Sequence, residues 1–187
     1  MNGLIYSFES YQTNIQLINN RFHSNYATQS GGVLSFRSMR QQTSALNIVN
    51  NTFTNNRCGQ NGGVYSFILT DYKIASGNNT YINNTAGLSG GVGYGLRASF
   101  VFFEEDGVYL NNTAGSFGGT WYISFNNYKT NLQSFGFSQT SFISSLAQSM
   151  LFLELFLKKI LLGGGSIYLE AGSLTFNQCI FKVYFHS

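Results

Sequence analysis

The sequence predicts an all-β chain that coils into a right-handed parallel β-helix, a solenoid of about six turns. Two repeated patterns predict this fold: glycine pairs recur every 28 to 31 residues, and an aromatic-x-x-Asn motif begins nine residues before each pair. Composition is the third observation, because the chain has 21 glycines, no proline and 17% aromatic residues. This mixture favours pleated strands separated by glycine turns over helices.

Each glycine pair precedes a short strand-like run such as Val33-Leu34-Ser35-Phe36, and the segment from Asn2 to Phe8 follows the same pattern. The pairs are Gly31-Gly32, Gly62-Gly63, Gly90-Gly91 and Gly118-Gly119. They suit corners of a coil, where the backbone needs either a positive φ or a close approach to the next coil. Both demands disfavour residues that carry a Cβ.

The second motif predicts ladders of like residues, because stacked coils place equivalent positions about 4.8 Å apart. The expected aromatic stack consists of Phe22, Phe53, Tyr81, Tyr109 and Phe142. The expected amide ladder consists of Asn25, Asn56, Asn84 and Asn112, with side chains that hydrogen-bond from coil to coil. Ser145 occupies the fifth position of the amide ladder, where we expect the ladder to be interrupted.

The repeat length and the composition together indicate one domain over residues 1–187. Ankyrin and tetratricopeptide repeats have similar lengths but need helical periodicity, whereas alternation, β-branched residues and aromatics dominate here. Charged residues make up 9% of the chain and its net charge is +3, with the basic residues scattered. No basic patch for nucleic acid is therefore expected.

These repeats resemble the polymorphic outer-membrane-protein family, whose signatures are Gly-Gly-Ala-Ile and Phe-x-x-Asn, within the pectin-lyase-like β-helix superfamily. Here Val, Thr or Ser stands where that family has Ala, and Tyr replaces Phe twice. The resemblance implies an adhesive role at the cell surface. Large protist surface proteins contain similar repeats, and the Asn-, Phe- and Tyr-rich composition resembles theirs.

Residues 146–162 interrupt the repeat, because the next glycines arrive about a dozen residues late, at Gly163. This inserted segment is rich in unbranched helix formers, and Glu154 and Lys158 are spaced for an i,i+4 pair. We expect a short helix that bulges from the solenoid. It is shorter than a membrane span and carries three charges, so it would either bind a membrane surface or partner, or pack on the solenoid.

Glu104, Glu105 and Asp106 form the one acidic cluster in the sequence. We interpret them as a solvated charge patch, and a weak calcium site is the alternative. A polysaccharide-cleaving enzyme would need these carboxylates to converge with Arg97 or other basic residues in a concave site. Cys58 and Cys179 form no metal or disulfide pattern and are expected to be buried thiols. The spacing of residues suggests no Ser/His/Asp or Cys/His constellation either, and no catalytic residue, metal site or cofactor is predicted.

Four Asn-x-Thr sequons make Asn50, Asn78, Asn83 and Asn111 candidate glycan acceptors if the chain enters a eukaryotic secretory pathway. Alternatively, the sequons arise freely in an Asn-rich repeat. The function that these observations favour is a structural or adhesive, non-catalytic segment of a cell-surface or secreted protein, with a carbohydrate-active protein as the alternative.

A longer parent protein is also expected, because neither end of the chain carries a polar cap and no signal peptide is present. Membrane attachment would then use regions outside this chain. The partner would be a protein or a glycan.

Overall fold

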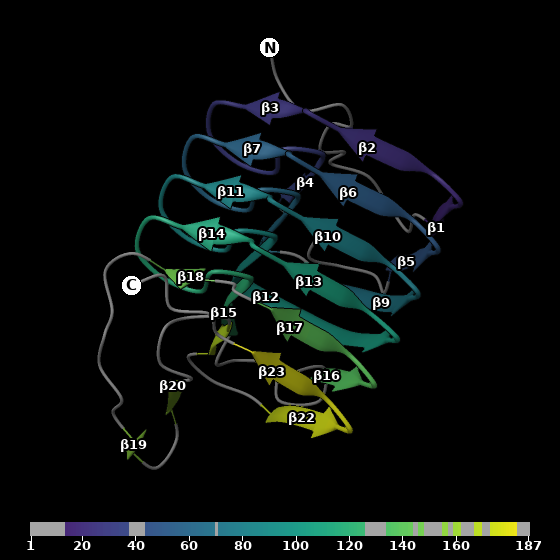
Figure 1. Ribbon diagram of the computed structural model, residues 1–187, viewed down its shortest axis with the longest axis vertical. Helices are drawn as coiled ribbons and strands as arrows, with labels where there is room; N and C mark the ends of the chain where they lie inside the picture. The colour runs from purple at the N-terminus through teal and green to yellow at the C-terminus, as the bar shows by residue number, and fades with distance from the viewer. Residues whose placement is uncertain are drawn as a thin grey trace.

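The computed structural model describes residues 14–37, 44–69, 71–125, 134–143, 146–147, 155–156, 159–161, 167–169 and 173–182. Every regular element within these residues is a β-strand. The strands wind into a solenoid whose turns stack from the N-terminal to the C-terminal end (Figure 1). The chain crosses the near face of Figure 1 from right to left as it descends, which is the sense of a right-handed coil. The predicted fold class is confirmed.

Each turn contributes strands to four sheets, here called A to D. Sheet A contains β4 (Leu34–Arg37), β8 (Tyr65–Ile68), the first part of β12 (Gly93–Glu105), β15 (Trp121–Phe125) and β21 (Ile167–Leu169). Sheet B contains β1 (Asn14–Ile18), β5 (Ser44–Val49), β9 (Asp71–Gly77), the second part of β12, β16 (Ser134–Ser138) and β22 (Ser173–Asn177).

Sheets C and D are built from shorter strands. Sheet C contains β2 (Arg21–His23), β6 (Thr52–Thr54), β10 (Thr80–Ile82), β13 (Val108–Leu110), β17 (Ser141–Ile143) and β23 (Ile180–Lys182). Sheet D contains β3 (Tyr26–Ala27), β7 (Arg57–Cys58), β11 (Thr85–Ala86), β14 (Thr113–Ala114) and β18 (Leu146–Ala147). Within these sheets each of the strands named so far pairs in parallel with its equivalent in at least one neighbouring turn.

The regular solenoid has about four turns, fewer than the six predicted. Strands β1–β4 form the first turn, and the fourth ends at β15. Below it, β16, β17, β18 and β21 extend the four sheets, and β22 and β23 extend sheets B and C. The prediction counted a glycine motif in residues 1–13 and another at 163–165, and both lie outside the described residues.

The expected helix in the inserted segment is wrong where the structure describes it. Residues 155–156 form β19 (Leu155–Phe156), which pairs antiparallel with β20 (Lys159–Leu161), and β20 pairs antiparallel with β21. The remaining residues between 148 and 162 lie outside the described part of the chain. The strand edge of β21 offers main-chain donors and acceptors, and pairing with that edge overrides the helix propensity of this Leu-rich segment.

The interior contains the predicted aromatic stack. Neighbouring rings along Phe22, Phe53, Tyr81, Tyr109 and Phe142 are nearly parallel, with centroids 4.9, 5.1, 4.5 and 4.9 Å apart. Phe181 adds a further ring 4.9 Å beyond Phe142. The stack therefore joins the six strands of sheet C through one continuous column of aromatic rings, of which only the last, Phe181, is exposed.

The amide ladder runs parallel to the aromatic stack at the corner between sheets C and D. The side-chain Nδ2 of each Asn donates to Oδ1 of the next, over 2.9 Å for Asn25 to Asn56 and 3.0 Å for each of the two steps from Asn56 through Asn84 to Asn112. Each Oδ1 also accepts from the main-chain N–H of the preceding Asn. Ser145, the expected interruption, lies outside the described residues.

Truncation of the first rung, Asn25→Ala, should lower the free energy of unfolding by about 1 kcal/mol, because one amide donor to Asn56 is lost while the main-chain donor remains. Urea unfolding followed by the fluorescence of Trp121 would measure this. The matched control is Asn47→Ala, an amide on the outer face of β5, which should change stability by less than about 0.5 kcal/mol. Equal losses in the two variants would contradict a stabilising role for the ladder.

The two glycines of each pair meet different demands. The first adopts a positive φ, as Gly90 does at 68°. The second approaches the next turn, because a Cβ on Gly91 would lie 2.0 Å from the carbonyl oxygen of Gly119. The sequence predicted that either constraint could apply, and the structure assigns one to each glycine.

Candidate functional site

Glu104 lies inside the solenoid, and the expectation that it belongs to a solvated patch is wrong. It occupies an inward position of β12 in register with Ser76 and Phe137, and its side chain is 0% exposed. Alternation along the strand places Glu105 on the opposite, outer face. The period-two pattern could have indicated this burial, because Glu104 aligns with the apolar Ile48 and Phe137 in the repeat.

The carboxylate of Glu104 accepts hydrogen bonds from four buried side chains. Oε1 accepts from Asn79 Nδ2 at 3.2 Å, and Oε2 accepts from the hydroxyl of Ser76. Oε2 also accepts from the phenols of Tyr81 and Tyr109 at 3.4 and 3.3 Å. The carboxylate is therefore fully enclosed by donors rather than open to a substrate.

Gly107 makes room for the Glu104 side chain. A second amide ladder, which the sequence reading missed, runs from Asn20 through Asn51 to Asn79. In the next turn its position is held by Gly107, where a Cβ would lie 2.7 Å from Cγ of Glu104. Because the next turn has no Asn at this position, the Asn79 amide donates its hydrogen bond to the Glu104 carboxylate instead.

Burial raises the pKa of the Glu104 carboxyl from 4.5 to about 7, and the hydrogen bonds from Ser76, Asn79 and Tyr109 limit the rise. Burial also raises the pKa values of Tyr65, Tyr81 and Tyr109 well above 10, with the charge of Glu104 adding to the rise. These phenols therefore remain protonated at neutral pH and act as donors. A pKa near 7 is useful for acid-base catalysis, but here the group has no contact with solvent.

The three acidic residues do not converge in the way that a polysaccharide-cleaving site requires. Glu104 points inward, whereas Glu105 is exposed on sheet B and Asp106 is exposed at the following corner, with a φ of 52°. Arg97 lies at the irregularity between the two parts of β12 and is exposed. Among the described residues no group of three or more His, Cys, Asp or Glu side chains is placed to hold a metal ion.

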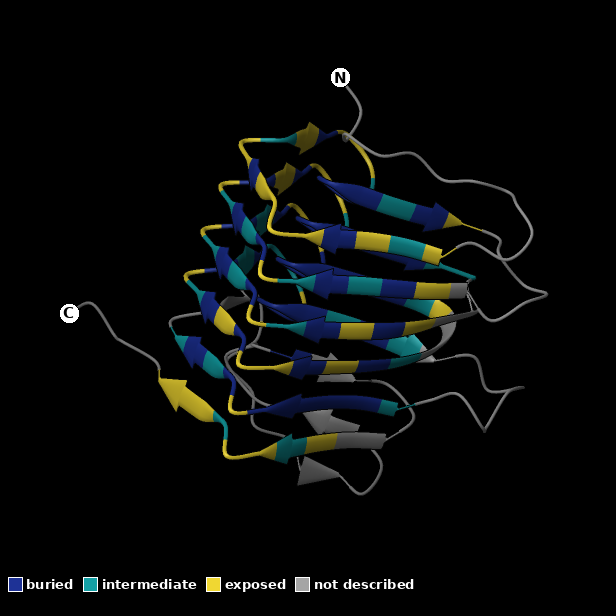
Figure 2. Cartoon of the chain, turned by 90° about the vertical axis from the view of Figure 1, so that its right-hand side faces the viewer, coloured by how far each residue is buried: buried dark blue, intermediate teal, exposed yellow. Residues whose placement is uncertain are grey.

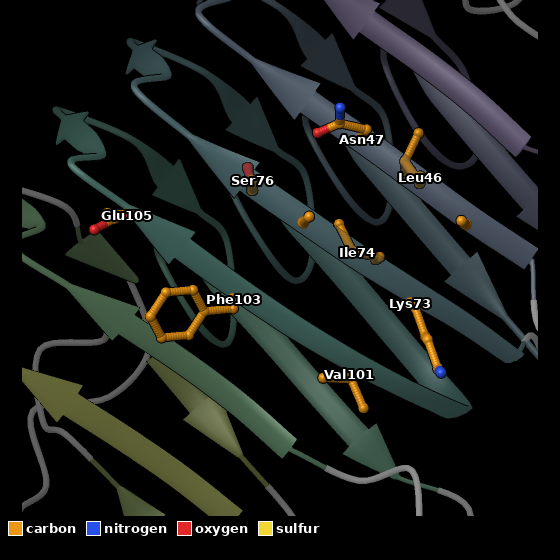
Figure 3. Close-up of a pocket in the computed structure, with 10 residues that line it drawn as sticks. Leu46, Asn47, Lys73, Ile74, Ser76, Val101, Phe103 and Glu105 are labelled. Carbon is orange, nitrogen blue, oxygen red and sulfur yellow. The ribbon is translucent and has the colours of Figure 1, made fainter.

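A shallow hollow of about 760 Å³ lies on the outer face of sheet B (Figure 3). Its lining is mainly apolar and comes from three neighbouring turns. The lining residues are Ala45, Leu46, Asn47, Lys73, Ile74, Ala75, Ser76, Val101, Phe103 and Glu105. Figure 2 looks onto this face, where exposed and buried residues alternate along β9 and the second part of β12.

Phe103 is the most prominent side chain of this face, at 47% exposed. Its ring lies over Gly136 of the next turn, where a Cβ would come within 3.1 Å of the ring. Lys73 and Glu105 are both exposed and lie on opposite sides of Phe103 in the close-up (Figure 3). The sequence reading missed this surface, although Phe103 stands at an outward position where the two preceding turns have Asn47 and Ala75.

The four sequon asparagines all lie at exposed corners. Asn50 and Asn78 follow β5 and β9, whereas Asn83 and Asn111 follow β10 and β13. All four are exposed and adopt φ values between 53° and 56°. Their amide groups are accessible in the folded chain, and glycosylation itself stays a prediction.

The thiols differ from each other. Cys58 is buried, and its Sγ donates to the carbonyl oxygen of Gln29 at 2.9 Å, whereas Cys179 is only partly buried, contrary to expectation. Burial raises the pKa of the Cys58 thiol. Within the described ranges, no helix is long and apolar enough to cross a membrane.

Comparison with protein-family models, with characterised proteins and with solved structures finds no match to this chain. The resemblance to polymorphic outer-membrane-protein repeats therefore stays a prediction.

Proposed function

We propose that this chain is a non-catalytic structural segment of a cell-surface or secreted protein, a stiff spacer that presents an adhesive surface. The observation that carries the proposal is the division of roles between inside and outside. Inside the solenoid, Glu104 and the asparagines of the amide ladder are engaged in coil-to-coil hydrogen bonds, whereas the outer face of sheet B exposes an apolar hollow beside Phe103.

The ladders support the spacer role. Stacked aromatic rings and hydrogen-bonded amides connect each turn to the next along the whole regular part of the solenoid. Bending the solenoid would stretch several such contacts at once, which favours a rigid rod. A rod of this kind holds a binding surface at a fixed distance from its attachment point.

The outer face of sheet B supports the adhesive role. Phe103 is 47% exposed, and in the preceding turns its neighbours on this face include the small side chains of Ala45 and Ala75. Exposed aromatic residues at the centre of apolar surfaces contribute strongly to binding.

The test uses beads coated with the chain and three surfaces that bear gelatin, heparin or polygalacturonate. Wild-type beads should adhere to at least one surface, and Phe103→Asp should reduce the bound beads by roughly tenfold, because a charge in the hollow is costly to desolvate. Phe117→Asp, which changes another exposed aromatic residue (38% exposed), is the matched control and should adhere like wild type. Equal adhesion of beads with wild-type chain and beads without protein would contradict the proposal.

The alternative is a carbohydrate-active protein. The observation that favours it is that Lys73 and Glu105 line one hollow together with Phe103, so a sugar ring could stack on the aromatic face while its hydroxyl groups contact the charges. Release of reducing or unsaturated ends from polygalacturonate, lost in Glu105→Gln, would support this alternative.

A further inference from the structure

The described side chains on the exposed face of sheet B include two of opposite charge. Among the described outward side chains of this sheet, Lys73 and Glu105 are the charged ones, and the rest are apolar, amide or hydroxyl groups. No ion pair joins either of them to another described residue. The apolar members are Ile18, Ala45, Val49, Ala75, Val101 and Phe103.

The register fixes how these charges are arranged. Lys73 pairs with Val101 of the next turn, and Glu105 lies four residues further along that same strand. The two charges are therefore separated by about 13 Å along the strands and by one strand across them. Phe103 lies midway between Val101 and Glu105, close to the centre of the line that joins the two charges.

This arrangement is self-complementary. A two-fold axis can lie in the plane of the face, perpendicular to the line from Lys73 to Glu105 and through its midpoint. Such an axis brings Lys73 of each copy opposite Glu105 of the other, and it brings the two Phe103 rings together near the centre. Both charges then gain partners, and the most exposed aromatic ring of the face becomes covered.

We propose that the partner of the sheet B face is a second copy of this chain, which packs face to face around this two-fold axis. The inference rests on the proposed adhesive function, and it names the partner as the chain itself. Homotypic packing of two β-sheets is a stable geometry, because side chains of the two faces interdigitate at a separation of about 10 Å.

The size of the face sets the area that two copies can bury. Six strands spaced about 4.8 Å apart, each about 16 Å long, give a flat area of about 460 Å² per copy. Two copies bury about 920 Å² in total, which is below the area of stable specific interfaces and in the range of weak, transient ones. The dimer is therefore expected to be weak and reversible.

Sedimentation velocity between about 5 and 300 µM tests the proposal. The wild-type chain should show a dimer fraction that rises with concentration, and Phe103→Asp should remove it. Lys73→Glu and Glu105→Lys should each weaken the dimer at least about tenfold, because each places like charges opposite one another. An equimolar mixture of these two variants should recover the dimer, since every charge then meets an opposite one.

The matched control is Arg57→Glu, which makes the same charge change as Lys73→Glu on an exposed residue of sheet D and should leave the dimer unchanged. All of these positions are on the surface, and thermal unfolding by circular dichroism should confirm that each variant folds. A wild-type chain that stays monomeric at 300 µM would overturn the proposal. A mixture no more dimeric than its two components would also overturn it.

The two proposals fail in different ways. If the chain remains monomeric but coated beads still adhere through Phe103, the second-copy inference is overturned and the adhesive function stands. If the dimer forms as described while the beads adhere to none of the three surfaces, the second-copy inference stands and adhesion to those other ligands is excluded.

Discussion

Gly91→Ala is expected to lower the free energy of unfolding by at least about 4 kcal/mol, enough to prevent the chain from folding if its total stability is ordinary. The new methyl group would lie 2.0 Å from the carbonyl oxygen of Gly119 and 2.6 Å from that of Thr113. Both are main-chain atoms of the next turn, so neither can move without separating the two turns. Soluble yield, far-ultraviolet circular dichroism and urea unfolding would measure the loss.

The matched control is Gly77→Ala at the end of β9. Its new methyl group would meet only the carbonyl oxygen of Glu105, at an ordinary contact distance of 3.6 Å. Because alanine also reduces the freedom of the unfolded chain, this variant should differ from wild type by less than about 1 kcal/mol. Equal stability of Gly91→Ala and Gly77→Ala would contradict the close approach of the two turns at Gly91.

The stability of the chain should fall as the pH rises from 5 to 8, through the titration of Glu104. Burial raises the pKa of this carboxyl from 4.5 to about 7, so the folded chain binds the proton more tightly than the unfolded chain between these values. The stabilising contribution is complete below pH 4.5 and is lost as the pH rises through 7. Its size is about 3 kcal/mol, at about 1.4 kcal/mol for each unit of pKa shift.

Glu104→Gln isolates this effect from the titration of other groups. The variant keeps an acceptor for Tyr81, Tyr109 and Ser76 but cannot ionise, so its stability should change with pH by about 3 kcal/mol less than that of wild type. Glu105→Gln removes the adjacent exposed carboxylate and should keep the wild-type difference between pH 5 and pH 8. Parallel pH profiles for wild type and Glu104→Gln, from urea unfolding, would contradict the buried position of Glu104.

The pH effect also bears on the spacer role. Glu104 connects Ser76 and Asn79 of one turn to Tyr109 of the next, so its charge state acts directly on the cohesion of two turns. A protonated Glu104 costs little to bury, whereas an ionised one must be stabilised entirely by its four donors. The solenoid is therefore most cohesive at this point under mildly acidic conditions.

The outcome for the inserted segment shows where local sequence signals fail. Leu, Lys and the spacing of Glu154 and Lys158 predicted a helix, but β20 pairs with β21 at the edge of sheet A. Helix propensity amounts to a few tenths of a kcal/mol for each residue, and an available strand edge outweighs it. Nothing local to the segment could have indicated that edge.

The sequence by itself determined the fold, the aromatic stack and the amide ladder that begins at Asn25, because a parallel solenoid places each residue beside its own repeat equivalent. Phe53, Tyr81 and Asn84 could be assigned their neighbours from spacing alone. Tertiary structure alone decided the rest: that Glu104 replaces an amide missing at Gly107, and that Phe103 lies between two opposite charges on an exposed face. Both features depend on which side of a strand faces inward and on which residue occupies the same position in the next turn. The repeat period predicts equivalent residues at equivalent positions, so it cannot predict the positions where the residue differs.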